Sequence, residues 1–154
     1  MQPLSKSEAE LRYGKIVDNK WEKETQFMVM YKVPQDIAAN WINAATNKPT
    51  TRIYINKDMQ AALDASLLAL VETGCILELK TFDGCFNIRD VRGVPGTLSW
   101  HSYGLAIDLN AKENPLNKPP VLSAAFVKCF TDNGFVWGGA FSRKDGMHFQ
   151  FGLG

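Results

Sequence analysis

The middle of the chain passes from the hydrophobic spacing of a strand to that of a helix. Residues 52–55 form a short run rich in β-branched and aromatic side chains, which predicts a strand. From Met59 to Thr73 the apolar side chains recur at helical spacing, which predicts a helix. Asn56 is a suitable N-cap for this helix, and Gly74 is a suitable residue to end it. We therefore expect a strand followed directly by a helix.

Two further strand-like runs follow the predicted helix. Residues 76–82 and 85–91 are separated by Asp83 and Gly84, and an Asp-Gly pair between two such runs predicts a hairpin. Residues 93–96 are rich in glycine and proline, which predicts a loop. This part of the chain is therefore expected to contribute an antiparallel hairpin and the loop that follows it.

The last third of the chain predicts two strands with a helix between them. Residues 104–109 are almost entirely apolar and are expected to form a buried strand. Residues 121–131 are expected to form a helix that ends at Asn133-Gly134, and residues 147–151 alternate as a final strand. The pattern here again mixes strands with separate helices.

The first fifty residues carry weaker patterns. A short helix is predicted from Ser5 to Tyr13, and the alternation of residues 27–33 predicts a strand. A second helix is expected over residues 36–46, ended by Pro49. Nothing in this segment indicates chemistry.

Hairpins mixed with separate helices indicate an α+β fold. The 154 residues, of which 45% are apolar and 21% charged, have the size and composition of one globular domain. We therefore predict a single domain over residues 1–154, with a mainly antiparallel sheet and flanking helices, and we expect it to be a monomer.

Charge and targeting patterns argue against several classes of protein. The formal net charge is +1, which gives no basic patch for a nucleic-acid partner. Residues 1–18 lack the apolar stretch of a secretory signal, and no segment reaches the ~20 apolar residues of a membrane span. Cys75, Cys85 and Cys129 are odd in number and widely spaced, which favours free thiols. We expect neither nucleic-acid binding nor membrane insertion.

The chain contains two histidines, and both lie next to predicted strands. Two imidazoles and one carboxylate are the minimum set of protein ligands for a catalytic zinc, whose fourth position stays open for water. His101, Asp108 and His148 would supply this set. Asp108 lies in an apolar strand, where an unpaired carboxylate is costly, so a metal or a buried arginine must compensate its charge.

The residues around these ligands resemble a known family of zinc peptidases. Ser99-x-His101-x-x-Gly104-x-Ala106-x-Asp108, followed at a distance by an acid-x-x-His motif, is similar to the family that includes D-alanyl-D-alanine carboxypeptidases, vancomycin-resistance dipeptidases and phage L-alanyl-D-glutamate endolysins. Residues 135–139, Phe-Val-Trp-Gly-Gly, resemble the endolysin-type members. The resemblance covers roughly residues 76–151.

The resemblance implies a role for each of four positions. His101, Asp108 and His148 would hold one zinc ion per chain, and Asp145 would be the general base that takes the proton of the attacking water. Many members of the family carry glutamate at the position of Asp145. Aspartate is found in the endolysin-type members, so this difference favours an endolysin.

The family also uses an arginine, placed before the first histidine, to polarise the scissile carbonyl. Arg89 and Arg92 are the two possibilities in this sequence, and their odd separation would place them on opposite faces of a regular strand. We favour Arg89, because it ends the clearer part of the predicted strand, and we assign Arg92 to substrate binding. The spacing to His101 is shorter than in relatives that carry a helix between arginine and histidine.

These features predict a zinc-dependent peptidase that cuts the peptidoglycan stem peptide, with a phage endolysin as the favoured type. Such an enzyme is made in the host cytoplasm without a signal peptide and acts on the cell wall after the membrane is permeabilised. The first alternative is a D-alanyl-D-alanine carboxypeptidase of wall metabolism. The second is a zinc-stabilised binding module, since hedgehog-type signalling domains share this fold. Asp145 favours an enzyme, because a binding module has no need of this carboxylate.

Overall fold

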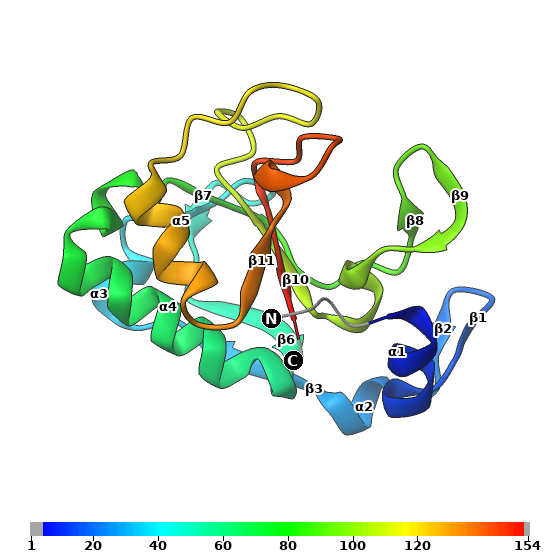
Figure 1. Ribbon diagram of the computed structural model, residues 1–154. Helices are drawn as coiled ribbons and strands as arrows, with labels where there is room; N and C mark the ends of the chain where they lie inside the picture. Colours follow the sequence, from blue (N-terminus) through cyan, green and yellow to red (C-terminus); the bar gives the residue numbers. More distant parts are fainter. Residues whose placement is uncertain (1–4, 153–154) are drawn as a thin grey trace.

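A six-stranded sheet forms the centre of the computed structural model, which describes residues 5–152 (Figure 1). Its strand order is β11-β12-β10-β7-β4-β5. All neighbouring pairs are antiparallel except β4 and β7, which are parallel. The α+β fold with a mainly antiparallel sheet is thus confirmed. The strands are β4 (Ile42–Asn43), β5 (Lys48–Pro49), β7 (Thr81–Gly84), β10 (Ala106–Leu109), β11 (Phe135–Trp137) and β12 (His148–Phe151).

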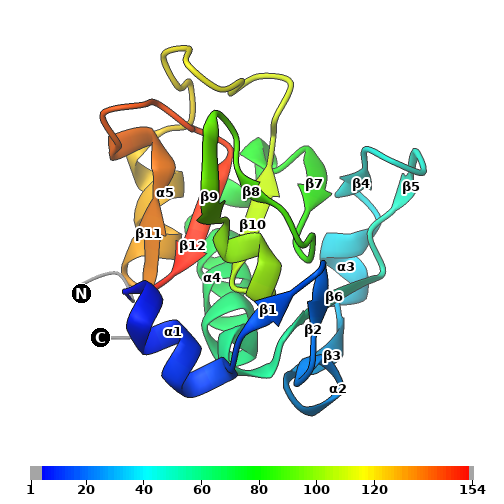
Figure 2. The same cartoon turned by 90° about the vertical axis from the view of Figure 1, so that its right-hand side faces the viewer.

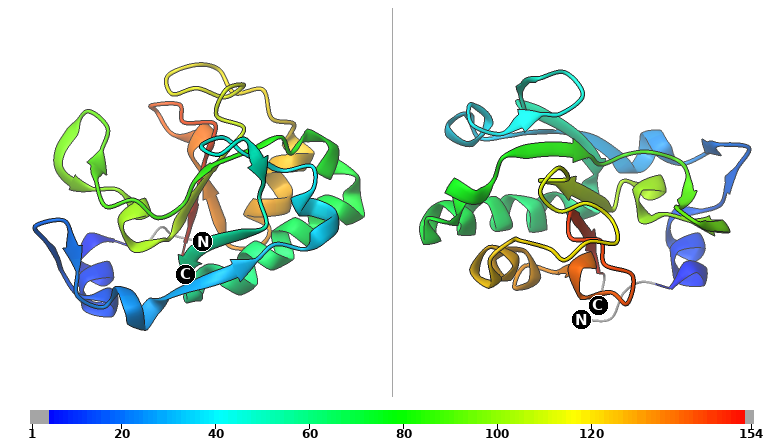
Figure 3. Two further views of the ribbon diagram at one scale, coloured as in Figure 1. Left: turned by 180° about the vertical axis from the view of Figure 1, so that it is seen from behind. Right: turned by 90° about the horizontal axis from the view of Figure 1, so that it is seen from above.

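Two helices, α4 (Gln60–Thr73) and α5 (Ala124–Thr131), pack against each other beside the sheet (Figures 1 and 3). Phe149 of β12 is fully buried, and its ring lies 4.6 Å from that of Phe130 in α5, measured between centroids. Because side chains alternate along a strand, His148 and Gln150 point to the other side of the sheet. The strand thus separates a helix-packed core face from a face that is available for chemistry.

The N-terminal part of the chain packs beside a short 3-10 helix, η3 (Trp100–Tyr103). The ring of Tyr103 lies 5.7 Å from that of Tyr13 and 5.5 Å from that of Trp21. The first fifty residues, for which the sequence suggested no role, therefore support the segment that carries His101. The elements of this part are α1 (Lys6–Tyr13), β1 (Ile16–Val17), β2 (Lys20–Trp21), α2 (Glu24–Phe27), β3 (Met28–Lys32), α3 (Gln35–Ala38) and β6 (Arg52–Asn56).

Several predicted elements are confirmed. Helix α1 begins after Ser5, whose side chain accepts a hydrogen bond from the backbone of Glu8. Strand β3 pairs with β6 in a separate two-stranded sheet. The Asn56 side chain caps η1 (Lys57–Met59), which leads into α4, and Gly74 ends α4 in the left-handed conformation with φ +77°. Capping and periodicity therefore predicted this region well.

The predicted hairpin of residues 76–82 and 85–91 is wrong. Residues 75–78 form a 3-10 helix, η2 (Cys75–Glu78), and β7 pairs with β10 and β4 instead of with the residues that follow it. The hairpin of this region lies further on, between β8 (Asp90–Val91) and β9 (Val94–Leu98) (Figure 2). The expected loop of residues 93–96 therefore lies mostly within β9. Long-range pairing of β7 outweighed the local turn signal of Asp83-Gly84.

The helix expected over residues 36–46 is also wrong in its extent. Only α3, four residues long, is helical, and the chain then turns into β4 and β5. Trp41 lies between α3 and β4, is fully buried, and its ring contacts that of Phe82 at a centroid distance of 5.7 Å. Burying this large side chain beneath β7 requires the chain to leave the helix.

The last predicted helix begins later than expected. Helix α5 starts at Ala124 because Ser123 caps it and accepts a hydrogen bond from the backbone N–H of Phe126. The N–H of Val121 donates to the side chain of Asn114, so Val121 belongs to the preceding loop. Within residues 5–152, no helix is long and apolar enough to cross a membrane.

Gly104 lies where η3 meets β10 and approaches a neighbouring backbone closely. Its φ is +65°, and a Cβ there would lie 2.6 Å from the sulfur of Met28 and 2.9 Å from the backbone nitrogen of Asn56. The sulfur is at the flexible end of a side chain. The Asn56 nitrogen donates to the Gly104 carbonyl oxygen at 3.1 Å, so it has no freedom to withdraw. Only glycine fits this position without distortion.

We expect Gly104→Ala to lower the free energy of unfolding by about 2–5 kcal/mol, because left-handed strain and overpacking act together. Gly74→Ala is the matched control. Gly74 also has a positive φ, but a Cβ there meets nothing within 4 Å. Strain alone should cost it about 1–2 kcal/mol. Urea denaturation measures both values, and equal losses in the two variants would contradict the close approach at Gly104.

Candidate metal centre

Three side chains from three elements meet on the free face of the sheet. His101 comes from η3, Asp108 from β10 and His148 from β12. One ligand atom from each residue lies within 4.8 Å of the other two. Asp108 and His148 are direct partners in the pairing of β10 with β12, so the sheet register places them together. The structure thus brings together the three residues that the sequence suggested as metal ligands.

The ring of His101 is held by a backbone carbonyl. Its Nδ1 lies 2.6 Å from the carbonyl oxygen of Cys85, and because a carbonyl only accepts, Nδ1–H is the donor. The other ring nitrogen, Nε2, then carries a free lone pair. It lies 3.2 Å from Asp108 Oδ2 but, within the described part of the chain, is buried without a hydrogen-bond partner. An orphaned lone pair of this kind suits a metal ligand.

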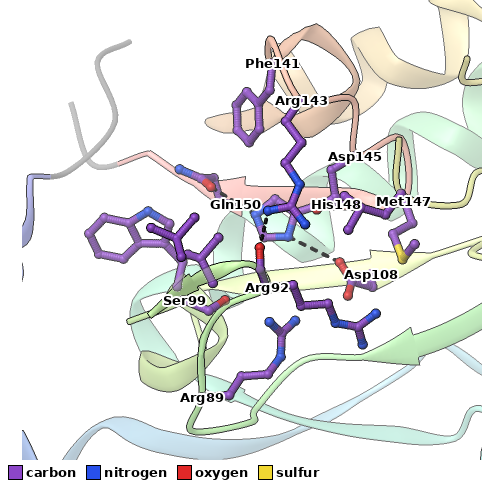
Figure 4. Close-up of a pocket in the computed structure, with 14 residues that line it drawn as sticks. Arg89, Arg92, Ser99, Asp108, Phe141, Arg143, Asp145, Met147, His148 and Gln150 are labelled. Atoms are coloured by element: carbon purple, nitrogen blue, oxygen red, sulfur yellow. Dashed lines mark hydrogen bonds and ion pairs between the residues drawn. The ribbon is translucent and has the colours of Figure 1, made fainter. Parts of the chain in front are cut away.

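The ring of His148 is held by a side chain of its own strand. Its Nε2 lies 2.9 Å from Oε1 of Gln150 and donates to that oxygen. Its Nδ1 faces Asp108 Oδ1 at 3.3 Å. Each histidine therefore has one nitrogen engaged on the outer side and one directed at Asp108. Figure 4 shows this arrangement for His148. Such outer partners commonly orient metal-ligating histidines.

Asp108 is kept ionised by its two neighbours. Burial alone would raise its pKa, but contacts with His101 and His148 outweigh burial and hold the pKa below its ordinary value. For His148, burial lowers the pKa, and the contact with Asp108 more than offsets this, so the pKa is raised. A divalent cation that binds between this carboxylate and the two imidazoles would replace any proton held there, because metal ligands must be deprotonated.

The donor set fits zinc. Two imidazole nitrogens and one carboxylate oxygen are the ligands that zinc takes in catalytic sites, where a fourth position stays open. Among residues 5–152 the buried Nε2 of His101 finds no partner, which is a further sign of a metal, because a buried polar atom is costly unless something binds it. His101, Asp108 and His148 would hold the ion.

Asp145 lies beside this centre, in the loop between η4 (Gly138–Ala140) and β12. Its backbone N–H donates to the carbonyl of Gly138 at 3.0 Å, and its own carbonyl accepts from the N–H of His148 at 3.1 Å. A Cβ on Gly138 would lie 2.5 Å from the Asp145 carbonyl oxygen, so glycine is needed for this close packing. The loop thus fixes Asp145 next to His148, one of the three candidate metal ligands.

The environment of Asp145 favours its protonated form. Burial is the largest cause, and it raises the pKa of the carboxyl above its ordinary value. A carboxylate with a raised pKa is a stronger base, which suits general-base catalysis near neutral pH.

A cavity joins Asp145 to the metal centre (Figure 4). Its walls are largely apolar, with a few convergent polar groups, as is usual for ligand sites. The lining residues are Arg89, Val91, Arg92, Val94, Ser99, Trp100, Asp108, Leu116, Phe141, Arg143, Asp145, Met147, His148 and Gln150.

Both predicted arginines line this cavity. Residues 86–89 are not part of a strand, so the alternation that was expected to separate Arg89 from Arg92 does not apply. The backbone of Arg89 is fixed to η3 and its cap: its carbonyl accepts from Ser99 N–H at 2.9 Å and from Ser102 Oγ at 3.0 Å. Arg92 lies in the turn of the β8–β9 hairpin and is exposed. Arg89 is therefore the better anchored of the two.

Sequence reasoning missed two residues of this site. Gln150 is two residues after His148 in an alternating strand, so the period of the strand could have indicated that it shares the face of His148. Arg143 lies in the loop before Asp145, lines the cavity and donates a hydrogen bond to the carbonyl oxygen of Arg92. No spacing or motif points to Arg143, because its place depends on how the loop folds.

Comparison with known proteins gives one match. Residues 92–151 match a family model described as D-alanyl-D-alanine carboxypeptidase. This range contains His101, Asp108, Asp145 and His148, and it leaves out Arg89. No curated protein and no solved structure matches the chain significantly.

Proposed function

We propose that this chain is a zinc-dependent peptidase that hydrolyses a peptide bond of the peptidoglycan stem peptide. One observation carries the proposal: a carboxylate with a raised pKa, Asp145, lines the same cavity as Asp108 and His148, which form the candidate ligand set together with His101. A metal site that only stabilises a fold is closed and needs no neighbouring base. The family description of residues 92–151 supports the same class of reaction.

Zinc bound by the three ligands would supply Lewis-acid activation of water and of the scissile carbonyl. Asp145 accepts the proton of the attacking water and delivers it to the nitrogen of the leaving amine, which balances the hydrolysis. The Arg89 guanidinium donates hydrogen bonds to the carbonyl oxygen as negative charge develops there. The anchoring of its backbone by Ser99 and Ser102 supports this role, since a positioned donor needs little reorganisation.

Two bonds of the stem peptide are considered. The resemblance of Asp145 and of residues 135–139 to endolysin-type members favours the bond between L-alanine and D-glutamate, cut by a phage endolysin at host lysis. The description printed for the matching family model favours the second candidate, a D-alanyl-D-alanine carboxypeptidase. We favour the endolysin, because the sequence around Asp145 differs from the carboxypeptidase pattern.

Digestion of purified sacculi separates the candidates. We expect zinc-loaded protein to release new amino termini of D-glutamate, identified by mass spectrometry, and to clarify a suspension of sacculi. Cleavage of L-alanyl-D-glutamate frees the stem from the glycan strand, whereas removal of terminal D-alanine leaves the meshwork intact. The Asp145→Asn variant is the control for contaminating hydrolases.

The alternative results are equally clear. Free D-alanine without clarification would identify the carboxypeptidase and reject the endolysin. Tight binding of stem peptides by zinc-loaded protein, with no new termini after prolonged incubation, would instead support a non-catalytic binding module.

A further inference from the structure

Three arginine side chains line the cavity beside the metal centre. Arg89 and Arg92 lie on the side of the β8–β9 hairpin, and Arg143 lies in the loop before β12. Across residues 5–152, none of the three guanidinium groups has a carboxylate within ion-pair distance. Like charges in one cavity repel each other unless an anion lies between them.

The acidic residues of the cavity do not neutralise these arginines. The Asp108 carboxylate lies between His101 and His148, at 3.2 and 3.3 Å from their nearest ring nitrogens, and a metal at that centre would add further positive charge. Asp145 is the proposed base and must stay free to accept a proton. The cavity therefore has the charge of a site for an anionic ligand.

Arg143 is placed to act on such a ligand from across the cavity. Its guanidinium donates a hydrogen bond to the carbonyl oxygen of Arg92, so it connects the loop before β12 with the hairpin (Figure 4). It also lies close to Gly93, where a Cβ would be 3.5 Å from its Nη1. A guanidinium carries five N–H donors in a rigid fork. The bond to Arg92 orients the group and leaves other donors for a ligand.

We propose that Arg143 is a specificity-determining residue that binds a free carboxylate on the leaving residue of the substrate. The proposal rests on the peptidase function proposed above. Arginine suits the task because its fork matches the two oxygens of a carboxylate. Arg143 and Asp145 both line this cavity, so the arginine and the group that returns the proton to the leaving nitrogen face the same bound substrate.

Both bonds considered above present the same chemistry to this arginine. In each, the nitrogen of the scissile amide is attached to a carbon that bears a free carboxylate. In L-alanyl-D-glutamate this is the α-carboxylate of D-glutamate, because the stem continues through the side chain. In D-alanyl-D-alanine it is the C-terminal carboxylate. Arg143 would therefore bind the same group, a carboxylate next to the scissile nitrogen, in either substrate.

Two matched pairs of peptides test the inference. One pair contains L-alanyl-D-glutamate with the α-carboxylate free or converted to its amide. The other ends in D-alanyl-D-alanine or in D-alanyl-D-alaninamide. We expect wild-type protein to prefer the free carboxylate of whichever pair it cuts by about 10- to 100-fold in kcat/KM, the value typical of a charge-assisted hydrogen bond. Arg143→Gln should lose most of that preference, because its loss in kcat/KM should be much larger for the free carboxylate than for the amide.

Lys144→Gln is the matched control. Lys144 is the next residue and is exposed, and the cavity lining, as drawn from residues 5–152, does not include it. Lys144→Gln removes the same charge as Arg143→Gln, but outside the cavity, so we expect this variant to keep the wild-type preference for the free carboxylate. Zinc content and melting temperature, measured for both variants, should equal those of the wild type. In the Asp145→Asn background, calorimetry should give tighter binding of the carboxylate peptide than of the amide, and Arg143→Gln should cancel this difference.

The two proposals fail in different ways. Equal cleavage of both members of a pair by the wild type, or an equal loss on both members in Arg143→Gln, overturns the role of Arg143 and leaves the peptidase standing. A wild-type protein with bound zinc that cuts no member of either pair overturns the peptidase itself.

Discussion

Asp145→Asn is expected to lower the rate of stem-peptide hydrolysis by about 10²–10⁴-fold, the usual contribution of a general base. Asparagine has the shape of aspartate, so the close packing of Gly138 against this loop is preserved. The amide cannot accept a proton from water as a carboxylate does. Release of new amino termini from peptidoglycan measures the rate, and elemental analysis of the same preparation measures the metal.

The variant should keep close to one zinc per chain, because the three proposed ligands are untouched. Near-wild-type turnover in Asp145→Asn would show that another group is the base. Loss of zinc would show that Asp145 is itself a ligand, and that one of His101, Asp108 and His148 is not.

His148→Ala is expected to abolish both zinc binding and hydrolysis. One imidazole and one carboxylate hold zinc poorly. The substitution also leaves Asp108 with one histidine where it had two, and a buried carboxylate that loses a partner is costly. We therefore expect the zinc content to fall to about 0.1 ion per chain or less after dialysis against metal-free buffer.

Comparison with Asp145→Asn makes this result specific. Both variants should be inactive, but only His148→Ala should be free of metal. A His148→Ala protein that retains stoichiometric zinc and activity would remove His148 from the site, and circular dichroism shows whether the variant is folded.

Local signals predicted the elements whose ends are set by their own residues. Ser5 caps α1, and Gly74 ends α4 because it adopts a left-handed conformation that other residues disfavour. These are contacts within a few residues, so the sequence contains all the information that they need.

Long-range pairing explains the errors. Asp83-Gly84 has the composition of a hairpin turn, yet β7 pairs with β4 and β10, which are distant in sequence. The residue after Gly84 instead contacts the candidate metal centre, since the Cys85 carbonyl accepts a hydrogen bond from His101 Nδ1. No local sequence pattern predicts that the Cys85 carbonyl has to lie beside the ring of His101.

Some residues of the candidate site could be predicted from the sequence, and others could be found only in the structure. Residue chemistry pointed to His101, Asp108 and His148, and the structure groups their ligand atoms. The family resemblance pointed to Asp145, which lines the same cavity as Asp108 and His148. Arg143 was missed because its approach depends on the fold of one loop and on its bond to the Arg92 carbonyl. Site residues that belong to a sequence motif can be predicted from the sequence, whereas the position of a residue such as Arg143 depends on how its loop folds.

The pairing of Asp108 with His148 across β10 and β12 has a consequence for how the protein folds. Shifting β12 by one residue would turn His148 into the core and bring Phe149 to the cavity, since side chains alternate. A misaligned sheet therefore has no metal site. Zinc in the folding medium would stabilise only chains with the correct strand alignment, and its uptake would report that the C-terminal strand has found its place. Zinc binding would then favour the correctly aligned sheet over misaligned ones during folding, in addition to any role in catalysis.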